Sequence, residues 1–225
     1  MKRFDKIVPD GMRDLLFEEC DTRRMVERKL SSLFSGLGYN EVLTPGIEFL
    51  DLFTEHSTRI PQETMYKFID RSGRLIVLRP DSTMPIARLV STKLKNSNMP
   101  IRLYYNQEVY KVNAVLSGKY DEVMQTGVEL IGADGDKADI EVIVTAVEAL
   151  SAHSDNFRLE IGHIGLFKAL SAKLPVSDDV REDIRFLIES KNYAALNDLL
   201  DKIENCKTAQ ALKQLPSLFG GDEVI

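Results

Sequence analysis

Residue types typical of metal centres and membrane proteins are scarce in this sequence. It has no tryptophan, three histidines and two cysteines, Cys20 and Cys206, which lack the paired spacing of a zinc site. No apolar run approaches the roughly 18 residues of a membrane-spanning helix, and the N-terminus has no stretch apolar enough for a signal peptide. We therefore expect a cytoplasmic protein with free thiols, no metal site and no membrane contact.

An excess of positive charge is also missing. Lys and Arg number 29 against 35 Asp and Glu, which leaves a formal net charge of -6. Proteins that grip nucleic acid through its phosphates usually carry a basic surface, because each neutralised phosphate releases a counterion. The charge balance therefore argues against nucleic acid, tRNA included, as a partner.

The apolar content is sufficient for one sizeable core, since 44% of the 225 residues are hydrophobic and no tract is of low complexity. Periodicity, capping residues and turn residues predict the regular elements. Helices are expected at about 13–37, from 81 or 82 to 95, and at 134–153, and strands at 39–44, 65–70, 74–80, 101–111, 121–132 and 157–161. From 164 onward the pattern predicts helices only, at about 164–173, 178–191, 193–205 and 207–214.

These elements predict an α+β fold with two parts. Residues 1–163 would form an antiparallel sheet flanked by helices, and residues 164–225 a small helical unit. The last residues, 220–225, resemble the start of a further element, so we expect the chain to be part of a longer protein.

Four polar residues suggest a binding pocket. Gln125 and Glu129 lie four apart on one expected strand, so their side chains point to the same face. Asp81 and Thr83 lie where a strand ends and a helix begins. If these elements converge, they form an acidic pocket without a basic residue, suited to an ammonium group. The alternative is that these are solvent-facing polar residues, which are more common on strands.

Three segments resemble a known family when taken together: GYNEVLTP at 38–45, LRPDST at 78–83 and GKYDEVMQTGVELIG at 118–132. They resemble the class II aminoacyl-tRNA synthetases, specifically the histidyl-tRNA synthetase family, over about residues 9–165. The resemblance implies that Asp81, Thr83, Gln125 and Glu129 contact L-histidine. The first segment resembles motif 1 of the family, which implies a self-dimer.

The sequence departs from the family where its motif 2 should bind ATP. The arginine expected after an aromatic residue is Lys111, the glutamate two positions on is Asn113, and the next arginine is Ala114. Lysine lacks the planar fork that binds carboxylate and phosphate with two parallel hydrogen bonds. The second catalytic arginine motif of the family is absent from these residues. We therefore expect no catalytic residues and no cofactor.

The segment LEIGHIGLFKAL at 159–170 is similar to a strand-to-helix junction of the ATP phosphoribosyltransferase regulatory subunits, which are synthetase paralogues without aminoacylation. This resemblance implies a non-catalytic regulatory subunit in the first step of histidine biosynthesis. Its partner would be the short-form catalytic ATP phosphoribosyltransferase, in a hetero-octamer that responds to histidine as feedback inhibitor. His163, between two glycines, is interpreted as a packed structural residue.

Two other functions stay open on the sequence alone. The first is an active histidyl-tRNA synthetase core, or another class II ligase, in which Lys111 does the work of the arginine. The second is an assembly module without any small-molecule site. Histidine-dependent pyrophosphate exchange would identify the first, and the absence of histidine binding would identify the second.

Overall fold

The computed structural model describes residues 5–54, 60–114, 117–162, 164–203, 207–215 and 220. His163, Cys206 and residues 221–225 lie outside them. Contacts divide the chain into two units, Met1–Phe157 and Arg158–Ile225, which are described separately. The boundary expected at 163/164 as a division between domains stays a prediction.

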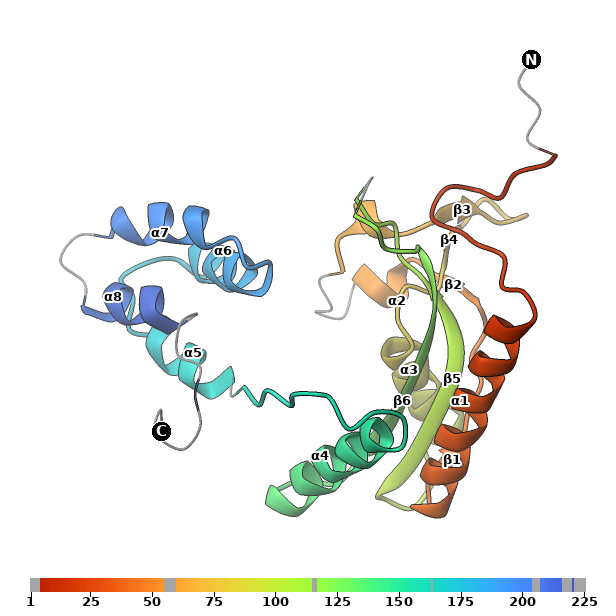
Figure 1. Cartoon of the computed structure of the whole chain (residues 1–225). Coiled ribbons are helices and arrows are strands. Elements are labelled where there is room, and N and C mark those ends of the chain that lie inside the picture. Colours follow the sequence, from red (N-terminus) through yellow and green to blue (C-terminus); the bar gives the residue numbers. More distant parts are fainter. Residues whose placement is uncertain are drawn as a thin grey trace. The chain divides into compact units, whose positions relative to one another are not determined.

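The first unit contains four α-helices, six strands and one 3-10 helix among its described residues (Figure 1). The helices are α1 (Glu18–Gly36), α2 (Asp51–Thr54), α3 (Thr83–Lys93) and α4 (Asp136–Ser151), and the 3-10 helix is η1 (Gln62–Thr64). The strands are β1 (Asn40–Glu41), β2 (Ile47–Phe49), β3 (Lys67–Ile69), β4 (Leu75–Leu78), β5 (Ile101–Tyr110) and β6 (Glu122–Ile131).

The strands form two three-stranded sheets. In the first, ordered β1-β5-β6, the long strands β5 and β6 are antiparallel along their whole length, from the pair Ile101–Ile131 to the pair Tyr110–Glu122. β1 joins β5 in parallel, which differs from the expected all-antiparallel sheet. A parallel partner is possible here because about 60 residues separate the two strands, enough for a crossover connection.

The second sheet, ordered β2-β4-β3, is antiparallel and contains the expected hairpin. Ile69 pairs with Leu75 next to a turn in which Gly73 has φ +80. The Asp70 carboxylate accepts hydrogen bonds from the backbone N–H groups of Ser72 and Arg74, which fixes the turn.

Helices cover both faces of the β5–β6 ribbon. Tyr104 faces α1, where its ring lies 5.8 Å from the ring of Phe34. Its neighbour Tyr105 points to the opposite face and packs with Ile86 of α3. This alternation follows from strand geometry. Side chains on the face that packs against α3 can therefore take part in a site at the end of β4.

Three expected elements differ from the structure, one of them the strand expected at 39–44, which is limited to Asn40–Glu41 of β1. The first helix begins at Glu18 rather than near 13, because the preceding segment contacts the β5–β6 connection: the Gly11 carbonyl accepts the Asp121 N–H at 2.7 Å. The strand expected at 157–161 does not form. No strand in the described ranges pairs with this segment, and an isolated strand leaves its backbone groups without partners.

The second unit is helical, as the periodicity predicted. Its described helices are α5 (Ile164–Ser171), α6 (Asp178–Glu189), α7 (Tyr193–Asp201) and α8 (Lys207–Gln214). They pack around one core made of Leu174, Ile184, Leu196, Leu200, Ala209 and Leu212. Each helix contributes a single apolar stripe, so the four must pack together to bury them.

Candidate functional site

The junction between β4 and α3 meets β6 at Gln125. The Gln125 side chain donates from Nε2 to Asp81 Oδ2 at 3.2 Å and accepts the Ser82 N–H at 3.0 Å. Asp81 also accepts the Thr83 N–H at 2.8 Å, two residues further on, as in an Asx turn at the start of α3. The carboxamide is therefore held by both the side chain and the backbone of the junction.

Glu129 lies on the same face of β6 and is half-buried. Burial raises the pKa of its carboxyl, a hydrogen bond with Thr83 lowers it, and the charge of Asp81 raises it again. The net shift is upward because two carboxylates share a partly desolvated region. The structure thus brings Asp81, Thr83, Gln125 and Glu129 together; that they bind histidine stays a prediction.

A cavity of about 770 Å³ opens beside this cluster. Asp81, Thr83 and Gln125 line it, whereas Glu129 is not among its lining residues. Lys111 and Lys119 line it as well, so the expectation of a pocket without a basic residue is wrong. Lys119 comes from the β5–β6 connection, and no local pattern predicts that this connection folds back over the junction.

A cavity lined by both carboxylates and ammonium groups suits a zwitterion. The carboxylates can pair with a ligand ammonium group, and the lysines can pair with a ligand carboxylate. A volume of about 770 Å³ lies within the range usual for small-molecule sites.

The three residues in the motif 2 positions have different surroundings. Lys111 is exposed, and its backbone N–H donates to the Asp121 carbonyl at 2.8 Å. The Asn113 side chain is used within its own loop, where Nδ2 donates to the carbonyls of Lys111 and Tyr120 at 3.0 and 2.9 Å. Ala114 is exposed and has no polar side-chain atom. None of the three offers the two parallel donors of an arginine.

Asp121, a buried residue that the sequence analysis overlooked, holds this loop. It accepts the Tyr66 hydroxyl at 2.6 Å and the Asn113 N–H at 2.9 Å. Burial alone would raise the pKa of Asp121, but these hydrogen bonds hold it below its ordinary value. The same contact raises the pKa of Tyr66 to about 12. The hydrogen bonds of the Asp121 carboxylate therefore hold in place the loop that lines the cavity at Asn113 and Asp121.

A second overlooked residue, Arg79, precedes the junction and is 4% exposed. Its guanidinium donates to the carbonyls of Thr44 at 2.7 Å, Pro45 at 3.0 Å and Glu108 at 2.6 Å. Burial lowers the pKa of Arg79, yet an arginine stays charged in proteins. The sequence signal was available, since a charged residue follows the apolar strand Leu75–Leu78 directly, but its partners are distant in the chain.

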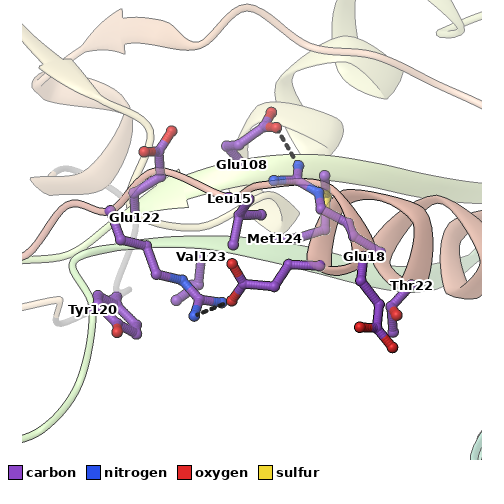
Figure 2. A pocket seen from close by; sticks show the side chains of 11 residues that line it. Leu15, Glu18, Thr22, Glu108, Tyr120, Glu122, Val123 and Met124 are labelled. Carbon is purple, nitrogen blue, oxygen red and sulfur yellow. Dashed lines mark hydrogen bonds and ion pairs between the residues drawn. The ribbon is translucent and has the colours of Figure 1, made fainter.

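A separate cavity of about 630 Å³ lies on the α1 face of the β5–β6 ribbon (Figure 2). Arg23 of α1 donates to Glu108 of β5 at 2.6 Å across it, and Arg13 lies 4.5 Å from the centre of the Tyr120 ring. Tyr120 lines both cavities. The segment before α1 thus contacts the loop that lines the candidate site.

Metal clusters and membrane-spanning helices are both missing from the described part of the chain. No group of three or more His, Cys, Asp or Glu residues there is placed to hold a metal ion. No helix there is long and apolar enough to cross a bilayer.

Comparisons with known proteins place the chain in a family. The family model for histidyl-tRNA synthetase matches residues 11–225. A curated relative from Clostridium novyi, named ATP phosphoribosyltransferase regulatory subunit, is 41% identical over 100% of this chain and 54% of its own length. The chain thus spans about half the length of the curated relatives it matches.

Solved structures show the same fold. An ATP phosphoribosyltransferase regulatory subunit/histidyl-tRNA synthetase from Bacillus halodurans matches with a TM-score of 0.88 and 33% identity, over 100% of this chain and 58% of that one. Apo histidyl-tRNA synthetase from S. aureus matches with a TM-score of 0.56 and 32% identity, over 65% of this chain and 39% of that one. With an α+β fold of the class II synthetase type and a family match over residues 11–225, the chain belongs to the histidyl-tRNA synthetase family.

Proposed function

We propose that the chain belongs to a regulatory subunit of ATP phosphoribosyltransferase that binds histidine without activating it. The observation that carries the proposal is one cavity in which Asp81 and Gln125 lie with Lys111 and Asn113. The first pair suits an amino acid, whereas the second pair replaces the groups that would bind an activated phosphate. The names of relatives such as the one from Clostridium novyi support the same reading.

The loss of activation follows from charge. Adenylate formation builds negative charge on the α-phosphate, and losing one preorganised donor costs about 2.7–4 kcal/mol of barrier, or ~100- to 1000-fold in rate. Lys111 keeps a charge but not the fork, Asn113 is bound within its loop, and Ala114 has nothing to donate. Several such losses together leave binding without chemistry.

In this proposal the protein acts on a catalytic ATP phosphoribosyltransferase subunit, which the name of the relatives implies. We further propose that this partner is the short form, that the subunit forms a self-dimer, and that the complex works in the cytoplasm. Histidine can regulate the partner only if it binds one state of the complex better than another.

The test is co-purification with the short-form catalytic subunit, followed by a phosphoribosyl-transfer assay with and without histidine. We expect a stable complex whose activity falls when histidine is added. A catalytic subunit that neither binds the protein nor changes its histidine response in its presence would contradict the proposal.

A further inference from the structure

A buried polar cluster connects the candidate site with the β1–β2 connection. It consists of Thr44, Arg79 and Gln107, which are 8%, 4% and 4% exposed. The Gln107 side chain donates from Nε2 to the Thr44 hydroxyl at 3.1 Å and accepts the Thr44 N–H at 3.2 Å. Arg79 Nη1 contacts both the carbonyl and the hydroxyl of Thr44, at 2.7 and 3.2 Å. The chain segments around Thr44, Arg79 and Gln107 are therefore hydrogen-bonded to one another.

Burying Arg79 between these segments costs desolvation free energy. All of its described acceptors are neutral, namely three carbonyls and the Thr44 hydroxyl. Taking the guanidinium out of water is costly, and the charges of Glu108 and Glu48 offset this cost only in part, since burial still lowers the pKa of Arg79. Arginine does offer several donors in a rigid plane, so it fixes the relative position of all its acceptors at once.

In the chain, Arg79 comes two residues before Asp81 of the candidate site. Its backbone N–H donates to the Gly46 carbonyl and its carbonyl accepts the Tyr110 N–H, both at 2.9 Å. Two residues later, Asp81 contacts Gln125, which lies opposite Gln107 in the β5–β6 register. Asp81 is thus linked along the chain to Arg79, and through Arg79 to Thr44 in the β1–β2 connection.

α3 provides a second connection to the same segment. Arg88 of α3 binds the buried carboxylate of Glu48 in β2 through two hydrogen bonds, at 2.6 and 3.1 Å. The Glu48 neighbours Ile47 and Phe49 are 49% and 43% exposed. Both ends of the Thr44–Phe49 segment are thus bonded to elements that lead into the cavity.

We propose that Arg79 is a positioning residue that couples occupancy of the cavity to the Thr44–Phe49 segment. The inference rests on the proposed function, because it takes histidine as the ligand. Histidine held by Asp81 and Gln125 restricts the motion of the junction. The hydrogen bonds of Arg79 extend this restriction to the carbonyls of Thr44 and Pro45. Thermodynamic reciprocity then requires that loosening the segment weakens histidine binding by the same factor.

Hydrogen exchange of the full-length protein, measured with and without histidine, tests the coupling. We expect histidine to slow exchange in peptides covering 40–49 by about 5-fold or more, the lower end of typical coupling between sites. In Arg79→Lys, which keeps the charge and loses the fork, this ratio should fall to near one. Arg185→Lys is the matched control, because it also loses a fork but lies in α6 of the second unit, where Arg185 pairs with Glu182 and Glu189 of the same helix, and it should keep the full ratio.

A purely structural role of Arg79 gives a different result. It would speed exchange with and without histidine and leave the ratio unchanged, which overturns the inference. If Arg79→Lys does not fold, Thr44→Val is the second variant: it removes the hydroxyl contact of Arg79 and leaves the carbonyl contacts, so it should lower the ratio part of the way, and an unchanged ratio would overturn the coupling. Calorimetry on the same samples separates the two claims: no histidine binding in the wild type overturns both, whereas binding without protection of 40–49 overturns the coupling alone.

Discussion

Gln125 and Asp81 meet across the β4–α3 junction, with the Gln125 Nε2 atom 3.2 Å from Asp81 Oδ2 and its Oε1 atom accepting the Ser82 N–H. Gln125 of β6 thereby orients Asp81. Asp81 and Asp121 are the acidic residues among those that line the candidate cavity. The geometry of the proposed ligand contacts depends on this amide.

Gln125→Ala should therefore weaken histidine binding by about 1–3 kcal/mol, or ~5- to 150-fold, because it leaves polar groups of the junction without partners. Isothermal calorimetry measures the change. Gln62→Ala, at an exposed residue of η1, is the matched control and should bind like the wild type. Unchanged affinity in Gln125→Ala would mean that the ligand binds elsewhere.

Glu129→Gln should stabilise the free protein at pH 7 and weaken histidine binding. The pKa of Glu129 is raised in the folded state, so its ionised form costs stability as pH rises through that pKa, and the cost disappears at pH values below the ordinary value of a glutamate. Urea unfolding at pH 7 and pH 4 should show a gain for the variant only at the higher pH. An equal gain at both pH values would contradict this account.

Histidine binding should also depend on pH through Glu129. A bound ammonium group favours the ionised carboxylate, so affinity should fall as pH drops through the raised pKa of Glu129. In Glu129→Gln this part of the pH dependence should vanish, which calorimetry from pH 7 down to the ordinary pKa of a glutamate can detect. A wild-type affinity that stays constant over the same range would show that Glu129 does not face the ligand.

Much of this arrangement was predictable because it is local. The four helices of the second unit begin and end within a few residues of their expected bounds, apart from α7, which stops at Asp201. Their apolar stripes and the flanking Pro175 carry enough information. β2 was missed because three residues, Ile47–Phe49, are too short for a periodic signal.

The remaining features depend on contacts between distant residues. A resemblance implied that Asp81, Thr83, Gln125 and Glu129 contact histidine; the structure brings the four together, and histidine binding stays a prediction. The acceptors of Arg79 lie about 30 residues away on either side, and Lys119 reaches the cavity only because its loop folds back. Periodicity describes which face of an element is apolar, and it does not specify which carbonyl a buried donor will find.

Tyr66→Phe tests the loop that lines the cavity. It removes the hydroxyl that Asp121 accepts at 2.6 Å, so it should destabilise the first unit by about 1–3 kcal/mol at pH 7. The pKa of Asp121 is lowered in the folded state, so this stabilisation is present above the ordinary value of an aspartate and is lost as pH falls through the lowered pKa. Tyr193→Phe, at an exposed tyrosine of α7, should show no comparable loss at pH 7 in chemical unfolding.

Gly127→Ala tests the packing beneath the site. A Cβ atom at this position would lie 2.6 Å from the Tyr105 hydroxyl oxygen, so the buried ring must move, at a typical cost of about 1–3 kcal/mol. Gly36→Ala is the matched control, because nothing lies within 4 Å of its Cβ and alanine favours a helix. Thermal unfolding should separate the two variants in opposite directions, and equal transitions would show that Tyr105 can give way freely.

The most direct measurement of the central claim pairs calorimetry with histidine-dependent pyrophosphate exchange on the full-length protein. We predict that histidine binds and that no exchange is detected above background, with or without the Lys111→Arg substitution, because Asn113 and Ala114 still lack the missing groups. Exchange in the wild-type protein at a rate typical of a synthetase would contradict the account.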